Sequence, residues 1–169
     1  MSTDIRLTPT SYVVLGLVRE LGEATPYALK QAAALSVGNF WSLQHAQLYS
    51  EPERLAKAGL LDEEIEATGR RRKTYRLTRA GRDALQAWLA EPPTEFTELR
   101  HRGLLKLALG ADPQVVAPAQ LALHEAKLAE YESLTDAPMP RGLRLALDSG
   151  IGHEREWVRF WRKLADDAG

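Results

Sequence analysis

Hydrophobic positions along the chain predict a series of helices that two short strands interrupt once. Residues 9–21 are apolar nearly all round, and Thr8-Pro9 supplies an N-cap and the proline favoured in a first helical turn. A helix without a polar face is buried, so this helix is expected to be central to the fold or to an interface. Gly22 ends it, and Thr25-Pro26 repeats the start signal for a second helix, TPYALKQAAAL.

The next segment carries helix signals that Pro52 interrupts. Ser42 is positioned to cap a short helix over residues 42–49. Because a proline inside a helix removes a hydrogen bond and clashes with the preceding turn, a kink or restart is expected near Ser50. Ser50 also has the spacing to a later glutamate that a capping box requires, so a second helical piece is expected over residues 51–58.

Alternating polarity then predicts a β-hairpin. Residues 60–66 and 73–78 alternate as two paired strands do. The connection between them, residues 67–72, includes Gly69 for the turn. A helix opens on Thr78, and its expected core-facing stripe consists of Ala80, Leu85, Trp88 and Leu89.

The segment Glu91-Pro92-Pro93-Thr94 predicts a boundary between two domains, residues 1–90 and 95–169. Only helical patterns follow it, over residues 95–109, 113–134 and 141–166. Trp157 and Trp161 share a face of the last helix, as aromatic side chains in a core or a dimer interface do. The middle helix carries a heptad-spaced seam of small residues that suits close helix–helix contact: Val115, Ala119, Ala122, Ala126 and Ala129.

The order of the N-terminal elements is typical of a winged helix-turn-helix, in which one helix enters a DNA groove and a basic hairpin lies beside it. The predicted fold is therefore mainly α. It consists of an N-terminal winged helix-turn-helix with a two-stranded β wing, followed by an all-helical C-terminal region.

Charge changes this picture only locally. The 169 residues carry a net charge of −1, so non-specific affinity for DNA should be modest. Four consecutive cations nevertheless occupy the connection of the predicted hairpin and the start of its second strand: Arg70, Arg71, Arg72 and Lys73. Charge runs are usually solvated faces. A hairpin tip is a poor place for structural ion pairs, so contact with phosphates or the minor groove is favoured here.

Polar side chains on the short helix and beside it are the candidates for DNA recognition. Glutamine can contact adenine through two hydrogen bonds, and a tyrosine hydroxyl commonly reaches a phosphate. The alternative is that these residues are only the exposed polar face of a short helix. The candidates are Ser42, Gln44, His45, Gln47, Tyr49 and Arg54.

Other chemistry finds little support in the sequence. The absence of cysteine excludes disulfides and thiolate sites, and the four histidines lack metal-ligand spacing. No nucleophile–base pair or glycine-rich phosphate loop stands out, so neither an enzyme nor a cofactor is expected. No apolar run approaches the roughly 20 residues that span a bilayer, and the N-terminus lacks signal-peptide regions. A cytoplasmic protein without membrane contact is expected.

Several motifs resemble those of the PadR family of transcriptional regulators. They are LGLVRELGEATPYALK, then Trp41 with the Leu48-Tyr49 pair, RLAKAGLL at 54–61, KTYRLTRAGRDALQAWL at 73–89, and the closing LALDSGIGHEREWVRFWRKL. The resemblance covers most of the chain and is most specific in its N-terminal half. The family usually has proline directly after the Leu-Tyr pair, where this chain has Ser50 and then, two positions on, Pro52.

The resemblance implies a homodimer that binds a palindromic double-stranded DNA operator and acts as a repressor. It also implies that residues 95–169 dimerise and respond to an effector, and that Tyr27 and Lys30 contact the DNA backbone. The alternative for Tyr27 is a place in the core. Some family members hold flat ligands against aromatic walls near the dimer interface, which makes Trp88 a candidate for binding a small aromatic effector.

A different class of protein remains as the alternative. A ligand-binding or protein-interaction module could keep a winged-helix shape without reading DNA, and the near-neutral charge and Pro52 favour it. The salt dependence of DNA binding separates the two classes, because only phosphate contacts give a steep loss of affinity with salt.

Overall fold

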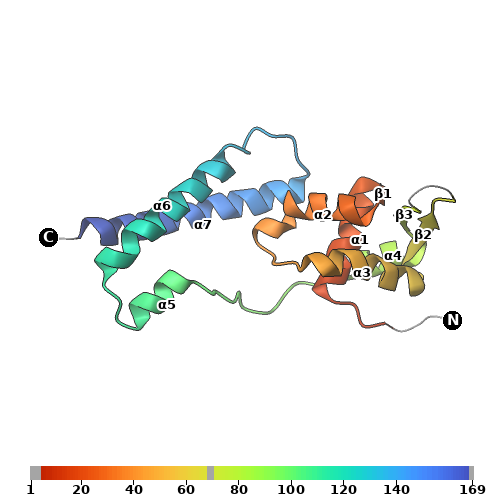
Figure 1. The fold of residues 1–169 in the computed structure, drawn as a ribbon, viewed down its shortest axis with the longest axis horizontal. Helices are drawn as coiled ribbons and strands as arrows, with labels where there is room; N and C mark the ends of the chain where they lie inside the picture. Colours follow the sequence, from red (N-terminus) through yellow and green to blue (C-terminus); the bar gives the residue numbers. More distant parts are fainter. Residues whose placement is uncertain (1–4, 68–70, 168–169) are drawn as a thin grey trace. The chain divides into compact units, whose positions relative to one another are not determined.

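The computed structural model describes residues 5–67 and 71–167. The chain forms two compact units, which we call the winged-helix unit, Met1–Glu95, and the helical unit, Phe96–Gly169 (Figure 1). The assignment of separate functions to residues 1–90 and 95–169 stays a prediction.

The winged-helix unit contains four α-helices, a 3-10 turn and three strands in the residues that are described. In chain order they are α1 (Pro9–Leu21), β1 (Glu23–Ala24), α2 (Pro26–Ala34), the 3-10 turn η1 (Val37–Asn39), α3 (His45–Lys57), β2 (Leu61–Ile65), β3 (Lys73–Leu77) and α4 (Arg79–Ala90). The strands form an antiparallel sheet in the order β1-β3-β2. This arrangement confirms the predicted winged helix-turn-helix.

The sequence signals for helix starts are confirmed at three places. The Thr8 side chain accepts a hydrogen bond from the Ser11 amide at the start of α1, and Thr25 caps α2 in the same way. Thr78 caps α4 by accepting from the Gly81 amide. Gly22 ends α1 with a φ of 75°, a conformation that glycine adopts without strain.

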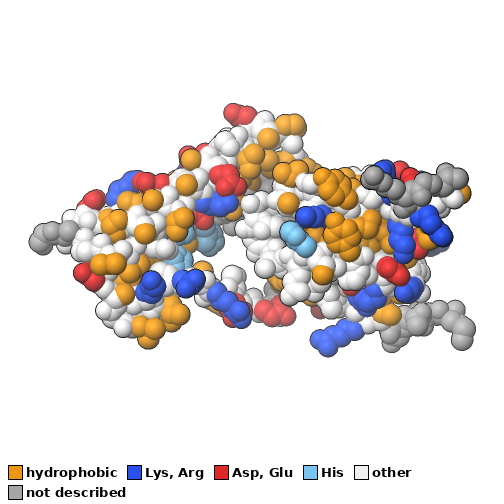
Figure 2. All heavy atoms as spheres, viewed as in Figure 1, with side chains coloured by type: hydrophobic (Ala, Val, Ile, Leu, Met, Phe, Trp, Pro, Cys, Tyr) orange, Lys and Arg blue, Asp and Glu red, His pale blue; other side chains and the backbone are white. Residues whose placement is uncertain are grey.

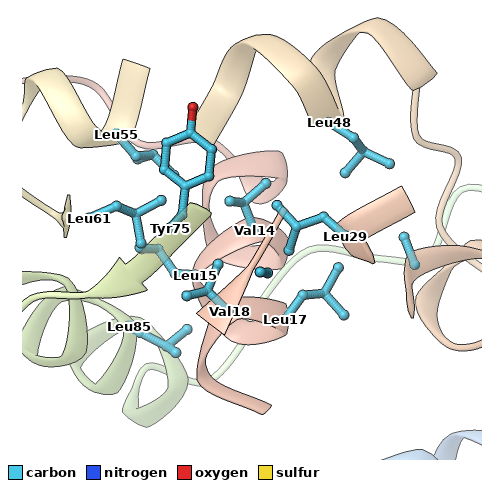
Figure 3. Packing of buried hydrophobic residues seen from close by; sticks show 12 residues of the cluster. Val14, Leu15, Leu17, Val18, Leu29, Leu48, Leu55, Leu61, Tyr75 and Leu85 are labelled. Carbon is cyan, nitrogen blue, oxygen red and sulfur yellow. The ribbon is translucent and has the colours of Figure 1, made fainter. Parts of the chain in front are cut away.

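The core of the winged-helix unit lies around α1 (Figure 3). Val14, Leu15, Leu17 and Val18 of α1 are buried against side chains from α2, α3, the sheet and α4. The Tyr75 ring of β3 lies among these aliphatic side chains, with its hydroxyl oxygen directed away from them (Figure 3). The predicted central place of the first helix is therefore confirmed, although its last residue, Leu21, is 44% exposed.

The predicted helix restart at Ser50 is wrong, because α3 runs as one helix from His45 to Lys57 with Pro52 inside it. The helix also begins three residues later than Ser42. Pro52 is fully buried in the face of α3 that packs on the core, and this burial offsets the hydrogen bond that proline cannot donate. Ser50 makes no capping box; its hydroxyl donates to the Ala46 carbonyl one turn earlier at 3.2 Å.

The predicted stripe of α4 is also largely wrong. Of its four members only Leu85 is buried, and Ala80, Trp88 and Leu89 are exposed. The contact with the core is made instead by Gly81 and Leu85, because the helix lies close to the β2–β3 hairpin at its first turn.

The helical unit consists of α5 (Arg102–Ala108), α6 (Pro113–Glu132) and α7 (Arg141–Asp166). Helices α6 and α7 pack together along much of their length (Figure 1). Trp161 is completely buried against Val116 and Ala117 and forms the centre of this small core. None of the described helices combines the length and apolar character that crossing a bilayer requires.

The helix predicted over residues 95–109 is shorter than expected. Residues 95–101 are not helical, and α5 begins only after His101, whose side chain caps it. Phe96 is fully exposed. This segment therefore buries no apolar face, and a short helix without such a face has little to stabilise it in water.

Two glycine substitutions should separate crowding from helix propensity. A Cβ at Gly81 would lie 2.0 Å from the Leu60 carbonyl oxygen and 2.9 Å from Leu77 Cδ2, whereas one at Gly152 of α7 meets nothing within 4 Å. Gly81→Ala should lower the free energy of unfolding by about 3 kcal/mol. Gly152→Ala should raise it by about 0.5–1 kcal/mol. Urea unfolding measures both, and equal effects would contradict the packing of α4 on the hairpin.

Candidate nucleic-acid interface

The first turn of α3 is exposed, while buried side chains further along the helix anchor it to the core. Leu48, Pro52 and Leu55 share the buried face, a spacing of four and three residues that forms one helical stripe. Gln44, His45 and Gln47 are exposed at the N-terminal end, and Tyr49 keeps 48% of its surface exposed. Their polar groups can therefore reach a ligand without disturbing the core.

The start of α3 also lacks a side-chain cap among the residues that the structure describes. Its first amide groups and the positive end of the helix dipole consequently face the surroundings. Oxygen atoms of a phosphate satisfy such groups well. Ser42 is exposed in the segment just before the helix.

Helix α2 presents the two residues expected to contact the DNA backbone. Tyr27 is 62% exposed, so its alternative place in the core is wrong. Its hydroxyl accepts a hydrogen bond of 2.9 Å from Gln31 Nε2 one turn along α2. Lys30, on the same helix, is half-buried.

The wing carries two exposed arginines next to strand β3. Arg71 has a φ of 49°, in the left-handed region, and Arg72 is held by a hydrogen bond of 3.0 Å from the Glu66 amide to its carbonyl. The structure describes no ion pair for either side chain. Arg70, the first cation of the predicted run, lies outside the described residues.

The other cations of the hairpin are engaged inside the unit. Lys73 Nζ lies 3.3 Å from a Glu63 carboxylate oxygen and 3.5 Å from one of Glu53. The hydrogen bond to Glu63 and the charge of Glu53 raise the pKa of Lys73. Arg76 similarly pairs with Glu23 on β1 and with Glu64 on β2. On the face shown in Figure 2, both basic and acidic side chains lie over this unit.

Arg54 also has an internal partner that the sequence did not predict. Its guanidinium makes two hydrogen bonds to the Glu51 carboxylate, at 2.6 and 2.9 Å, and donates to the Ser11 hydroxyl at 3.0 Å. Ser11, completely buried on α1, donates in turn to Glu51 at 2.6 Å. Burial opposes ionisation of Glu51, but the hydrogen bonds from Arg54 and Ser11 outweigh it and lower its pKa. The network ties α3 to α1.

A second polar contact supports the wing. The Tyr75 hydroxyl donates to Glu63 at 2.7 Å across the paired strands. Burial of the ring and the neighbouring Glu63 carboxylate both raise the pKa of Tyr75, so the hydroxyl stays protonated as a donor. The residues of these networks, Ser11, Glu51 and Glu63, were not predicted, because partners so far apart in the sequence leave no local pattern.

An exposed recognition helix with an uncapped start, beside a hairpin with exposed arginines, defines a DNA-binding protein of the winged helix-turn-helix class. Comparison with known proteins agrees. Residues 14–87 match the model of the transcriptional regulator PadR-like family. In sequence, the chain is 35% identical over 171 residues to the negative transcriptional regulator PadR of Bacillus subtilis (strain 168), covering 90% of this chain and 93% of the relative.

Solved structures give the same result for the fold. Bacillus subtilis PadR in complex with operator DNA has a TM-score of 0.82 at 24% identity, covering 96% of this chain and 99% of the other. The same protein in complex with p-coumaric acid has a TM-score of 0.76 at 24% identity, covering 92% and 96%. These likenesses extend across both units.

The chain belongs to the PadR-like family of transcriptional regulators. The family resemblance noted in the sequence is thereby confirmed, and a DNA-binding regulator is favoured over a module that does not read DNA. Members of this family are regulators, not enzymes. In the part of the chain that is described, no group of three or more His, Asp or Glu side chains is arranged to hold a metal ion.

Removing the carboxylate of Glu51 should show that Arg54 serves the fold. Glu51→Gln should lower the free energy of unfolding near pH 7 by about 1–2 kcal/mol, a value reduced because the Arg54 side chain is 38% exposed. The folded-state pKa of Glu51 is lowered, so its contribution is present above about pH 4.5 and is lost as pH falls through the folded-state pKa. The difference between wild type and variant should therefore narrow in acid.

Urea unfolding near pH 7 and near pH 3.5 measures this change. Glu91→Gln is the matched control, because the Glu91 side chain is exposed at the end of α4. It should unfold as the wild type does at both values. A Glu51→Gln difference that is independent of pH would contradict an ionised Glu51 in this network.

Proposed function

We propose that the chain is a repressor that binds a palindromic operator as a homodimer. The observation that carries the proposal is the exposed first turn of α3 beside the arginines of the wing, in a chain of this family. The related Bacillus subtilis protein supports it, since that protein is a negative regulator whose structure is known with operator DNA. In this proposal residues 1–90 bind DNA, and residues 95–169 dimerise and respond to an effector.

The DNA contacts divide by chemistry. Side chains at the start of α3 read base edges in the major groove, and those of the wing and of α2 position the protein on phosphates. The proposed base contacts are Gln44, His45 and Gln47. The proposed backbone contacts are Tyr27, Lys30, Ser42, Tyr49, Arg70, Arg71 and Arg72.

Arg54 and Lys73 have a smaller share in this proposal. Both were candidates for DNA contact, and both are engaged by carboxylates within the fold. A phosphate would have to compete with these ion pairs, so we assign Arg54 mainly to holding α3 and Lys73 mainly to holding the wing.

The dimer is proposed to form through the small-residue seam of α6. Val115 is 75% exposed in the single chain and Leu123, beside the seam, is 63% exposed, while Ala119, Ala122 and Ala126 are also exposed. Small side chains allow close approach of a second helix. Trp161 is not available to a partner because it is buried within its own helical unit.

A small aromatic effector is proposed to release the DNA. The related protein's structure with p-coumaric acid supports this class of ligand. Trp88 stays a candidate, since its ring stacks on Tyr12 with centroids 4.5 Å apart and keeps 42% of its surface exposed. Binding of the effector would act by changing the angle between the two DNA-binding units of the dimer and hence the half-site spacing.

The wing arginines should supply salt-dependent affinity. Arg71→Ala combined with Arg72→Ala should weaken binding to all DNA sequences and reduce the slope of log affinity against log salt by up to about one unit per lost phosphate contact. Titrations at several salt concentrations, on DNA upstream of the chain's own gene and on unrelated DNA, measure the slope.

Arg19→Ala is the control, because Arg19 is an exposed cation on α1 that pairs with Glu20. It should leave the slope unchanged. Gln47→Ala in the same assay should reduce discrimination between the two DNAs by about 1–3 kcal/mol with little change in slope. An unchanged slope in the double arginine variant would contradict the role of the wing.

The α6 seam should decide the oligomeric state. Ala122→Glu places a carboxylate where two helices are proposed to meet, so the dimer should dissociate at micromolar concentration. Ala122→Ser is the control, since it keeps the side chain small and should leave the dimer intact. Sedimentation of the full chain measures both. A monomeric wild type, or a dimeric Ala122→Glu variant, would contradict this interface.

A further inference from the structure

Three titratable side chains from three helices form a hydrogen-bonded chain in the helical unit. His101 lies at the start of α5, His124 on α6 and Glu154 on α7. His101 Nε2 is 3.2 Å from His124 Nε2, and His124 Nδ1 is 2.6 Å from a Glu154 carboxylate oxygen. The third and fourth contacts are with the backbone, where the amides of Gly103 and Leu104 donate to His101 Nδ1 at 3.1 and 3.3 Å.

The backbone contact assigns the hydrogen on each ring. His101 Nδ1 accepts from two amides, so it keeps its lone pair and the hydrogen of the neutral ring is on Nε2. That hydrogen is donated to His124 Nε2, which must therefore be an acceptor. The hydrogen of His124 is then on Nδ1 and is donated to Glu154. All four contacts are satisfied only when both rings are neutral.

Neighbouring side chains shield these three residues from much of the solvent. The side chains of His124 and Glu154 are each 16% exposed. Trp157 packs on both imidazoles, with ring centroids 4.6 Å from His101 and 5.7 Å from His124. Burial and the neighbouring His124 ring lower the pKa of His101, and the charge of Glu154 opposes this only in part.

The charged groups nearby are few and mostly engaged with each other. On α6, Lys127 and Tyr131 interact electrostatically with Glu154, and Lys127 is paired with Glu130 at 2.7 Å. On α7, Arg155 is paired with Glu132 of α6 at 2.8 Å. The cations of α5, Arg102 and Lys106, are exposed. Glu154 is therefore the carboxylate placed to receive a protonated imidazole.

A metal ion between the two imidazoles does not fit the same geometry. Coordination through both Nε2 atoms would require the hydrogen of His101 to move to Nδ1. There it would oppose the two backbone amides that point at this atom.

We propose that His101, His124 and Glu154 form a proton-sensitive cap on α5. If His124 takes up a proton at Nε2, two N–H groups face each other unless His101 shifts its hydrogen to Nδ1. If His101 takes up the proton itself, Nδ1 receives it directly. Either route places a hydrogen on the atom that caps α5, so proton uptake releases the amides of Gly103 and Leu104. The device concerns the free protein and goes beyond the proposed function.

The loss of the cap matters because α5 is short. It has seven residues, and apart from the cap it is held by Leu104 and Leu107, which pack on the core of Trp161. Gly103 lies close to the side chains of two neighbours, since a Cβ there would lie 2.8 Å from Gln120 Oε1 and 3.0 Å from His101 Cε1. Because the pKa of His101 is lowered in the fold, the cap is present above the ordinary histidine pKa of about 6.5 and is lost as pH falls through that lower folded-state pKa.

Nuclear magnetic resonance of the full chain without DNA tests the proposal. At about pH 7.5, imidazole nitrogen shifts should show the hydrogen of His101 on Nε2 and that of His124 on Nδ1. On acidification to about pH 5.5, the amide signals of Gly103 and Leu104 should shift together with the imidazole signals, with shared apparent pKa values. Their hydrogen-exchange protection factors should fall about fivefold, the effect of losing one N-cap.

Two variants separate the cap from the titration itself. Asparagine is a good N-cap that does not titrate, so in His101→Asn the amide signals of Gly103 and Leu104 should no longer follow pH. His153→Asn is the control, because His153 lies exposed on α7, where it contacts the Ser149 carbonyl and not the three hydrogen-bonded side chains. It should respond to pH as the wild type does.

The wild-type titration alone can overturn the proposal. A hydrogen on His101 Nδ1 at about pH 7.5 would do so, as would imidazole titration without any change at the amides of Gly103 and Leu104. Amide shifts in His101→Asn that follow pH as in the wild type would do so as well. None of these outcomes depends on operator binding, so a failure of the cap is distinguishable from a failure of the proposed repressor function.

Discussion

The winged-helix unit depends on the burial of one helix, α1, against nearly every other element of that unit. Its buried positions fall on adjacent faces, so α2, α3, the sheet and α4 can all pack on the same helix. The start of α3 and the wing are therefore positioned through a shared support. A site held in this way loses little conformational entropy when it binds, which favours a preformed DNA-binding surface.

Polar contacts fix the orientation of elements that apolar packing alone would leave free to rotate. A helix packed only by Leu48, Pro52 and Leu55 could still rotate slightly about its axis. The hydrogen bonds of Ser11 and Glu51 to each other and to Arg54 define one orientation, because a carboxylate shielded from much of the solvent is stabilised by keeping its donors in place. The contact from Tyr75 to Glu63 acts in the same way on the wing. Cations that sequence alone would assign to DNA thus serve in part to hold the reading elements.

Sequence predicted the elements whose signals are local and missed those that depend on distant partners. Threonine caps and apolar periodicity located α1, α2 and the long helices, and the hairpin followed from alternation. A helix restart was wrongly expected beside Pro52. The energetic cost of a proline inside a helix can be read from the local sequence, whereas the burial of Pro52 depends on tertiary packing. Strand β1 has two residues and exists only through its pairing with β3, so it has no periodicity of its own. For the same reason no spacing rule could find His101, His124 and Glu154, which three different helices bring together.

The internal ion pairs also explain how a nearly neutral chain is suited to read DNA. Every cation free to meet a phosphate strengthens binding to all sequences alike, and a genome offers a vast excess of such non-specific sites. Pairing Lys73 and Arg76 with carboxylates reduces that general affinity, while the residues proposed to read bases at the start of α3 stay exposed. In the proposed dimer, the affinity lost in each half-site is recovered because the second half-site binds at high effective concentration. This gain in affinity is made only on DNA that presents both half-sites at the right spacing. Pairing cations within each unit would therefore make the proposed dimer more selective than a strongly basic monomer.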